Sequence, residues 1–559
     1  MSSPPVLLKQ ESAAQAASPP ETPEAKDKVE SPWVRANEKG REASQGSDGD
    51  EDTVAVHPGV GAVGATWKQR IPALLIILFL TLGSNFAQSS LSPLKSTLKK
   101  EIKGVTNARY GAIASADSLI NGVLPIFSGI VIDYYGPSMA SIWSSTFILL
   151  GTVLRAIGGT VGSFSLILGG QIIFGLGSTT IETAQSKLYT HWARGSVDGG
   201  AGWMGFIYGL DIAMGRVFNL MGRLSSIPIG ESTGKWYWSF WVSAILCAVT
   251  LLLNVAYVIL ERSLPERMRV VTGRQIARRS AASDADAGKK FKPLSKRHFK
   301  YISISIAAIP AAFWLVTMSQ ILQAGTVNAY TSNLAEMVEV TRGTTKLTAG
   351  YTSSLSQVIP IVLTPLVGLA FDLFGRRMYY VSATAALWVL VFSLLGFSDV
   401  HPLAPVILGS VALSSNAIPF IASIPLLVPS QISIGTAFGI WKAFNSAGST
   451  IMDVSTGAIQ DLTPTGTKQY SNVFYFLIAL KSVDVLFGLG YHMLDKRYFG
   501  GFLLLNEKQR INKEAEETEK HRMEGLRKPI RSWTLAGCCL LSAMVVTSYV
   551  VYVVYSIGT

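Results

Sequence analysis

Apolar stretches long enough to cross a bilayer alternate with short polar connections over most of the chain. The hydrocarbon core of a membrane is about 30 Å thick, which corresponds to about 20 residues of α-helix. Backbone groups in lipid must pair within their own segment, so such stretches form helices. The pattern predicts thirteen membrane helices, near residues 70–91, 109–133, 137–158, 164–191, 200–225, 236–260, 300–332, 345–374, 377–397, 402–428, 434–460, 472–494 and 534–557.

The spacing of these stretches predicts two sets of six helices followed by one additional helix. We therefore expect an all-α membrane protein made of two six-helix bundles. The first stretch of the chain lacks apolar periodicity and is expected to be disordered. The predicted parts are a disordered cytosolic tail (1–66), a first bundle (67–260), a cytosolic central loop (261–299), a second bundle (300–495), a charged cytosolic helical linker (496–533) and an extra transmembrane helix (534–557).

Two short segments, one in each predicted bundle, share one pattern. Residues 129–136 read GIVIDYYG and residues 368–375 read GLAFDLFG, each at the end of a long apolar stretch. Repeated halves with a site between them are the usual architecture of a secondary transporter. Each Asp can face the positive N-terminal end of a neighbouring helix, or a basic side chain, and hold the halves together. The expected structural and gating residues are Gly129, Asp133, Gly136, Gly368, Asp372, Gly375, Arg376 and Arg377.

Composition narrows the class of protein further. Charged residues make up 15% of the 559 positions and hydrophobic residues 49%, whereas a soluble protein carries about 25% charged residues. The net charge of +12 lies between the apolar stretches, which favours a lipid bilayer over nucleic acid as the partner. The basic stretches 261–300, 376–377 and 496–531 fall on one side, which we expect to be cytosolic. The three cysteines form no disulfide or metal pattern, and we expect no cofactor, no metal and no enzymatic activity.

Polar side chains form stripes on two neighbouring predicted helices. One stripe is Ser178, Glu182, Gln185 and Tyr189, and the other is Arg216, Asn219 and Arg223. Ionisable residues inside a membrane are costly and usually face a partner or a watery cavity. Glu182 and Arg216 can pair with each other when the site holds no substrate. When substrate binds, they can hold the ammonium and the carboxylate of a zwitterion. An ion pair that merely fixes the helix register is the alternative.

The paired segments resemble the loop signature of the major facilitator superfamily, over residues of about 70 to 495. Four further blocks look like the branch of that superfamily that contains the lysosomal dipeptide transporter, a uniporter: 118–123, 174–195, 209–222 and 423–448. The resemblance implies a Glu on the fourth helix and an Arg on the fifth that hold the termini of a dipeptide. Arg216 falls on the Arg position, whereas Thr179 falls on the Glu position and Glu182 lies one turn further on. The resemblance also implies a single-span accessory membrane protein as a partner.

In this superfamily the first, fourth, seventh and tenth helices line the cavity. Their polar residues join those of the fourth and fifth helices as candidate contacts to a small-molecule substrate. The candidate substrate-binding residues are Arg216, Glu182, Thr179, Gln185, Asn85, Gln88, Gln320, Asn328, Tyr330 and Asn416.

We predict a multi-pass transporter that moves a dipeptide or a similar zwitterion across a lysosomal or vacuolar membrane by alternating access. One alternative is a proton-coupled permease for a sugar or an organic anion at the plasma membrane, with Glu182 or Asp117 carrying the proton. Another is a membrane scaffold or sensor that transports nothing. A screen of purified protein for stabilising ligands would separate these possibilities.

Overall fold

The computed structural model describes residues 65–91, 93–102, 107–194, 202–275, 305–428, 433–464, 466–516 and 529–557. All of them belong to the compact unit formed by residues 57–559. The described part is helical and contains no strand. Nearly all of the predicted tail 1–66, much of the central loop 261–299 and the side chain of Asp117 lie outside the described residues.

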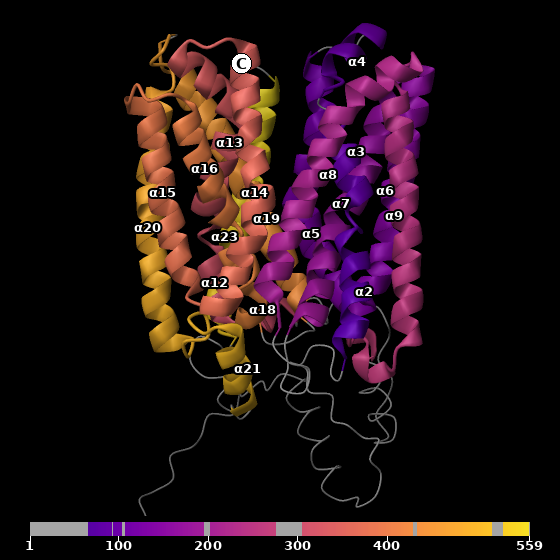
Figure 1. Ribbon diagram of the computed structural model, residues 1–559, viewed down its shortest axis with the longest axis vertical. Coiled ribbons are helices and arrows are strands. Elements are labelled where there is room, and N and C mark those ends of the chain that lie inside the picture. The colour runs from indigo at the N-terminus through magenta and orange to yellow at the C-terminus, as the bar shows by residue number, and fades with distance from the viewer. Residues whose placement is uncertain are drawn as a thin grey trace, which may run out of the picture. The chain divides into compact units, whose positions relative to one another are not determined.

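The first set of helices follows the predicted order, from indigo to magenta in Figure 1. The first apolar stretch is interrupted at residues 79–81 and so forms two helices in place of one. Thr66 and Gln69 start the first of these with a capping box, in which the Thr66 amide donates to Gln69 Oε1 at 3.1 Å. The helices are α2 (Trp67–Leu78), α3 (Leu82–Ser89), α4 (Lys95–Glu101), α5 (Asn107–Tyr135), α6 (Pro137–Val161), α7 (Phe164–Ala193), α8 (Met204–Thr233) and α9 (Trp238–Ser263).

The second set contains two broken membrane segments. Proline occupies an early position in α17 and α18, where its missing amide costs little. The seventh predicted helix runs on to Arg342, beyond its predicted end near residue 332, because Gly343 terminates it in a left-handed conformation. The helices are α12 (Ala311–Thr317), α13 (Gln320–Arg342), α14 (Lys346–Phe374), α15 (Arg377–Phe397), α16 (Leu403–Asn416), α17 (Ile418–Ile421), α18 (Ile424–Leu427), α19 (Ile434–Asp461) and α20 (Ser471–Tyr498).

Hydropathy separates the helices into two groups. In the described part of the chain, nine segments are long and apolar enough to span a membrane: α2–α3, α6, α7, α9, α14, α15, α16–α18, α20 and α23 (Arg531–Ile557). The helices α8, α13 and α19 are of similar length but more polar, and the apolar part of α5 is short. Helices α5 and α13 pack against α19, and helices α8 and α13 pack against α14, so the polar positions at these contacts face protein rather than lipid. The division into twelve spans plus one stays a prediction.

The short helix α4 contains lysines on the side of the membrane where the positive-inside rule does not expect them. Its apolar side chains Leu94, Leu98 and Ile102 are buried against Ala156 and Phe240, whereas Lys100 is exposed. The segment is therefore amphipathic and uses its apolar face for packing.

Two seams join the first set of helices to the second. In one seam α5 packs on α19, and in the other α8 packs on α14. Glycines allow both approaches: a Cβ on Gly129 would overlap the backbone of Gly435, and a Cβ on Gly368 would overlap that of Gly205. Each seam thus pairs the motif helix of one bundle with a helix of the other.

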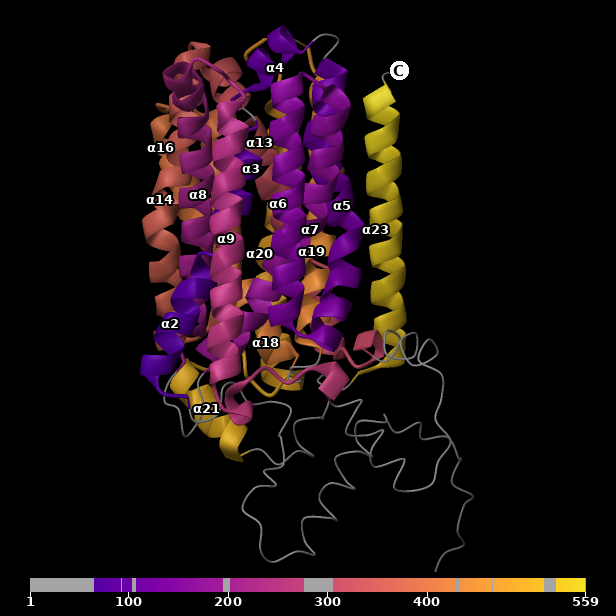
Figure 2. The same ribbon diagram turned by 90° about the vertical axis from the view of Figure 1, so that its right-hand side faces the viewer.

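The last helix, α23, lies along the first of these seams, as the yellow helix beside α5 in Figure 2. It contacts α19 and α12 of the second bundle and α5 of the first. Before it, the helix α21 (Glu507–Glu516) follows the end of α20 at the end of the molecule opposite α4. The predicted charged linker is thus helical in part, and residues 517–528 lie outside the described part.

Candidate functional site

Asp133, from the first motif, caps a helix of the opposite bundle. Its Oδ1 accepts a hydrogen bond from the Gly435 amide at 2.9 Å, and its Oδ2 accepts from the amide and the hydroxyl of Thr436, both at 2.6 Å. These amides are the unpaired donors at the start of α19, where the helix dipole is positive. Lys187 of α7 donates to the same carboxylate at 2.5 Å, and both side chains are buried.

Asp372, from the second motif, makes the equivalent contact in the opposite direction. Its two oxygens accept from the amides of Gly205 at 2.9 Å and Phe206 at 2.8 Å, in the first turn of α8. Each motif Asp therefore binds the N-terminus of a helix in the other bundle. The two capping contacts differ in their cation, which is Lys187 for Asp133 and the nearby Arg377 for Asp372.

The glycine that closes each motif has a positive φ, which is 99° at Gly136 and 68° at Gly375. Arg376, which follows Gly375, also has a positive φ of 53°, adopts the left-handed helical conformation and is exposed. Its amide and that of Arg377 donate to the carbonyls of Leu504 and Leu503, which lie beyond α20. The chain after α20 is therefore hydrogen-bonded to the residues that follow the second motif.

The buried Arg377 guanidinium lies in a group of charges at this position. It interacts electrostatically with Asp372, Asp495, Glu507 and Arg510. Glu507 and Arg510 form a bidentate ion pair within α21, with N–O distances of 2.5 and 3.0 Å. The linker therefore contributes charges to the end of the molecule that contains both motifs.

Glu182 of α7 and Lys442 of α19 form an ion pair between the bundles in the interior of the membrane region. The Glu182 side chain is 43% exposed and the Lys442 side chain is 20% exposed, so neither is fully buried. Glu182 also acts electrostatically on Asp211 of α8. A carboxylate and an ammonium in one accessible place can exchange partners with a zwitterion.

Arg216 of α8 lies in the second seam. Its Nη1 donates to Gln357 Oε1 on α14 at 2.5 Å. The expected pairing of Glu182 with Arg216 is therefore wrong for this structure, because each side chain reaches across to the opposite bundle. Both charged residues nevertheless lie at the junction between the bundles, one in each seam region.

The other candidates in the first bundle have mostly structural partners. Thr179 is buried and donates to Asn121 Oδ1 on α5 at 2.5 Å. Gln185 is buried and donates to the Ile77 carbonyl at 2.8 Å and to the Tyr189 hydroxyl at 3.0 Å, while that hydroxyl donates to Asp211. Asn85 is half-buried beside Gly215, and Gln88 is exposed.

The candidates in the second bundle are grouped around α13. Asn328 donates to Asp453 Oδ2 on α19 at 2.8 Å, and Asn416 donates to the Gln323 carbonyl at 3.4 Å. Gln320 and Tyr330 are buried, and Tyr330 packs edge-on against Trp388. The structure does not gather the ten candidates into one cluster, and their role in binding stays a prediction.

Three partners that complete these contacts were absent from the predicted site: Lys187, Gln357 and Lys442. Each is a polar residue within an apolar stretch, which is the signal that selects intramembrane candidates. Their partners lie on helices distant in sequence, so spacing along one helix cannot reveal the pairs.

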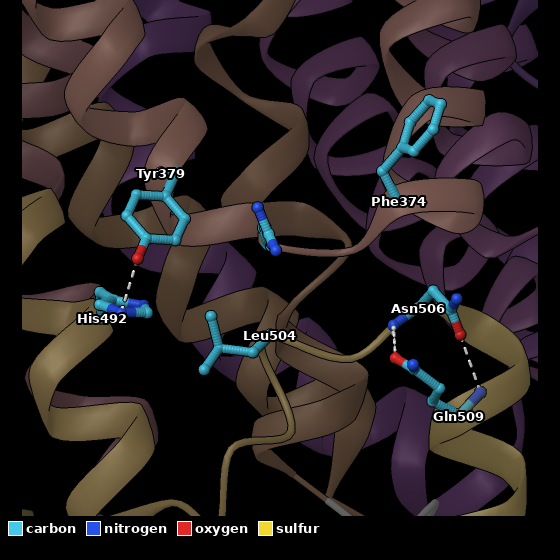
Figure 3. Close-up of a pocket in the computed structure, with 7 residues that line it drawn as sticks. Phe374, Tyr379, His492, Leu504, Asn506 and Gln509 are labelled. Atoms are coloured by element: carbon cyan, nitrogen blue, oxygen red, sulfur yellow. Dashed lines mark hydrogen bonds between the residues drawn. The ribbon is translucent and has the colours of Figure 1, made fainter.

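A separate cavity of about 490 Å³ lies outside the junction between the bundles (Figure 3). It is formed by the turn between α14 and α15, the end of α20 and the start of α21, with Phe374, Arg376, Tyr379, His492, Leu504, Asn506 and Gln509 as its lining. The Tyr379 hydroxyl and His492 Nε2 are 2.7 Å apart across it. The cavity is broadly open and adjoins the second motif rather than the Glu182–Lys442 pair.

No group of His, Cys, Asp and Glu within the described ranges has the arrangement of a metal site. This part of the structure thus contains charge pairs and helix caps at a junction of two bundles. Such an arrangement suits the binding and movement of a polar small molecule.

Comparison with known proteins gives a consistent picture. A family profile described as Major Facilitator Superfamily matches residues 75–452. The chain is similar to the lysosomal dipeptide transporter MFSD1 of Homo sapiens, with 22% identity over 80% of this chain and 91% of that protein. It is similar to the same transporter of Danio rerio, with 22% identity over 78% and 89% of the two chains.

Solved structures share the fold. The transporter FucP in the outward conformation has a TM-score of 0.53, with 18% identity over 75% of this chain and 99% of that one. The human organic anion transporter MFSD10 has a TM-score of 0.52, with 16% identity over 74% and 99%.

Proposed function

Because the chain belongs to the major facilitator superfamily of membrane transporters, we propose that it carries dipeptides, or zwitterions of similar size, across a lysosomal or vacuolar membrane. The related MFSD1 proteins are named lysosomal dipeptide transporters. Their low identity leaves the cargo to be argued from this chain's own charges.

The ion pair between Glu182 and Lys442 carries the proposal. A zwitterion has an ammonium and a carboxylate at opposite ends, so it can replace each partner of such a pair with a group of the same charge. Glu182 would then receive the ammonium and Lys442 the carboxylate. Arg216 on α8 would be a second ligand of the substrate carboxylate. Its planar guanidinium fits a carboxylate better than the ammonium group of a lysine does.

Alternating access would proceed by rocking of the two bundles about these contacts. The caps made by Asp133 and Asp372 join the bundles at the end that we expect to be cytosolic. In this arrangement substrate reaches the charge pair from the opposite side. Displacement of the Glu182–Lys442 pair by substrate would loosen the junction and favour release of the caps.

The test is uptake of radiolabelled alanyl-alanine into proteoliposomes that contain the full-length protein. We expect saturable uptake, inhibited by unlabelled alanyl-alanine. Acetyl-alanyl-alanine lacks the ammonium and alanyl-alanine amide lacks the carboxylate, so both should inhibit poorly. Saturable uptake of fucose or of an organic anion without uptake of alanyl-alanine would overturn the proposal.

Flux also separates a transporter from a sensor. A protein that alanyl-alanine stabilises against heat, but that moves none of it, would be a sensor rather than a carrier. Colocalisation of the tagged protein with a lysosomal or vacuolar marker tests the membrane, and residence at the cell surface would contradict it.

A further inference from the structure

The cavity shown in Figure 3 lies apart from the junction between the bundles and has a volume of about 490 Å³. This volume falls within the range of about 300–1,000 Å³ that is typical of small-molecule sites. The cavity adjoins the end of α14, on the side of the protein that we expect to be cytosolic. Glu182, Lys442 and Arg216 do not line it, so it is separate from the proposed substrate site.

Arg376 supplies the permanent positive charge of the lining. Its side chain is exposed, and its guanidinium has no hydrogen bond or ion pair with any residue that the structure describes. Arg377, the next residue, is instead buried among carboxylates. Arg376 is also the one residue other than glycine with a positive φ in the described ranges. This conformation is unfavourable for a residue with a side chain, and residues held in it cluster at functional sites.

Two side-chain amides of the lining are oriented by the start of α21 (Figure 3). The Asn506 backbone amide donates to Gln509 Oε1 at 3.3 Å, and the Gln509 backbone amide donates to Asn506 Oδ1 at 2.8 Å. This reciprocal cap uses the oxygen of each side chain. The NH₂ group of each therefore remains a donor, and neither has an acceptor in the part of the chain that the structure describes.

The lining thus offers donors and no negative charge. Among the described residues that form it, none is Asp or Glu. Glu507, which follows Asn506, is buried and paired with Arg510. Exposed basic residues lie close in sequence to the lining segments of α20 and α21: Lys496, Arg497 and Lys508. A planar guanidinium and two amides around one concave space suit an anion with several acceptor oxygens, such as a phosphate group.

Apolar side chains border the cavity on the outer surface of the protein. Phe374, which forms part of the lining, and Met493, which follows His492 on α20, are each 71% exposed. Tyr379 is 41% exposed, and aromatic side chains of this kind are typical of the boundary between membrane and water. The cavity therefore presents donors beside a surface that suits acyl chains, which is the arrangement that an anionic phospholipid requires.

We propose that this cavity binds the phosphate group of an anionic phospholipid, with Arg376 as its principal ligand. The NH₂ groups of Asn506 and Gln509 donate to further phosphate oxygens, and an acyl chain lies along Phe374. Free inorganic phosphate offers the same anionic oxygens, and the experiment separates the two sources. The site does not depend on which solute the protein carries.

The experiment measures thermal unfolding of the full-length protein in detergent micelles with increasing amounts of dioleoyl phosphatidylinositol. We expect a saturable rise in melting temperature, because a ligand that binds the folded state stabilises it by mass action. Dioleoyl phosphatidylcholine carries its own cation beside the phosphate and should give a clearly smaller rise. Inorganic phosphate, compared with sodium chloride at equal ionic strength, tests the free anion.

Arg376→Gly removes the guanidinium and relieves the left-handed backbone, so this variant should fold at least as well as wild type. Its half-saturating concentration of phosphatidylinositol should rise at least about tenfold, since hydrogen bonds to charged groups are the stronger ones. Gln509→Glu keeps the oxygen that caps α21 but replaces a donor with a negative charge, so it should also weaken binding. Arg497→Ala is the matched control, because Arg497 is exposed but does not line the cavity.

Three results would overturn the site: equal stabilisation by the two lipids, unchanged lipid affinity in Arg376→Gly, or equal weakening in Arg376→Gly and Arg497→Ala. The last would mean a general attraction to the basic surface. Stabilisation by inorganic phosphate that Arg376→Gly loses, without an effect of phosphatidylinositol, would support the phosphate site and overturn the lipid as its source.

Discussion

Glu182 and Lys442 form an ion pair that joins α7 of the first bundle to α19 of the second. The Glu182 side chain is 43% exposed and the Lys442 side chain is 20% exposed, unlike the fully buried Lys481–Asp484 pair. Accessible ion pairs contribute little to stability, about 1 kcal/mol or less. A pair whose main role is structural would therefore be poorly placed here, whereas a pair that exchanges partners with substrate needs this access.

Glu182→Gln should lower alanyl-alanine uptake by at least about tenfold, since one charge-assisted hydrogen bond is worth about 1.5–3 kcal/mol. The melting temperature of the variant should change little. The exchange Glu182→Lys with Lys442→Glu restores the pair in reverse and should restore stability without restoring uptake. Uptake and melting are measured on the same preparations.

The outcome that contradicts this role is a large loss of melting temperature with normal uptake in the fraction that folds. The pair would then act as a structural connection between the bundles.

Arg216 provides a second prediction. Arg216→Ala should abolish alanyl-alanine uptake while the protein still folds, and Arg216→Lys should recover part of it, because an ammonium keeps the charge but lacks the planar fork. Arg223→Ala is the matched control, since Arg223 is an exposed residue two turns along the same helix. The measurement is concentration-dependent uptake, and wild-type transport by Arg216→Ala would remove Arg216 from the site.

The paired motifs illustrate what the sequence could predict. The pattern around Asp133 and Asp372 indicated a helix N-terminus or a basic residue as partner, and the structure contains both kinds of contact. The membrane helices were also predictable, because hydropathy reports the long apolar stretches directly.

The partners of the charged residues could not be predicted in this way. Lys187 lies on α7, far in sequence from the Asp133 motif, and Lys442 reaches Glu182 from the other bundle. Helical spacing identifies which residues share a face, but it does not identify the face that lies opposite. The interruption at residues 79–81 was missed for another reason, since it breaks the helix without changing the hydropathy of the apolar stretch. The single-span accessory protein stays a prediction.

The two motif carboxylates should differ in their effect on stability. Asp133→Asn leaves the buried Lys187 without its anion, and breaking a buried pair costs about 3–5 kcal/mol. Asp372→Asn should cost less, about 1–3 kcal/mol, because the nearby Arg377 keeps Glu507 and Asp495 as counter-charges and only a helix amide loses its acceptor. Thermal unfolding of the purified variants measures which of the two substitutions lowers the melting temperature more.

The double variant Asp133→Asn with Lys187→Met tests the cause. Removing the unpaired ammonium should return most of the lost melting temperature, because Met fills a similar volume without a charge. If the double variant is as unstable as Asp133→Asn, the main contribution of Asp133 is its cap on α19 rather than its bond to Lys187.

The last helix should be docked rather than independent. Gly537 of α23 is so close to the buried Trp314 of α12 that an added Cβ would overlap the indole ring. Further along α23, the Tyr549 ring lies 3.7 Å from the position of a Cβ on Gly122 of α5. The helix therefore contacts both bundles, and a change at either contact should affect the whole protein.

Gly537→Leu separates docking from helix stability. Leu forms helices better than Gly by about 1 kcal/mol, so a free helix would gain from the change. A docked helix would lose, because the larger side chain displaces Trp314. We expect a lower melting temperature for Gly537→Leu and little change for the control Gly490→Leu on α20, where a Cβ meets no atom within 4 Å. A melting temperature for Gly537→Leu equal to or above that of wild type would mean that α23 does not rest on Trp314 in the membrane.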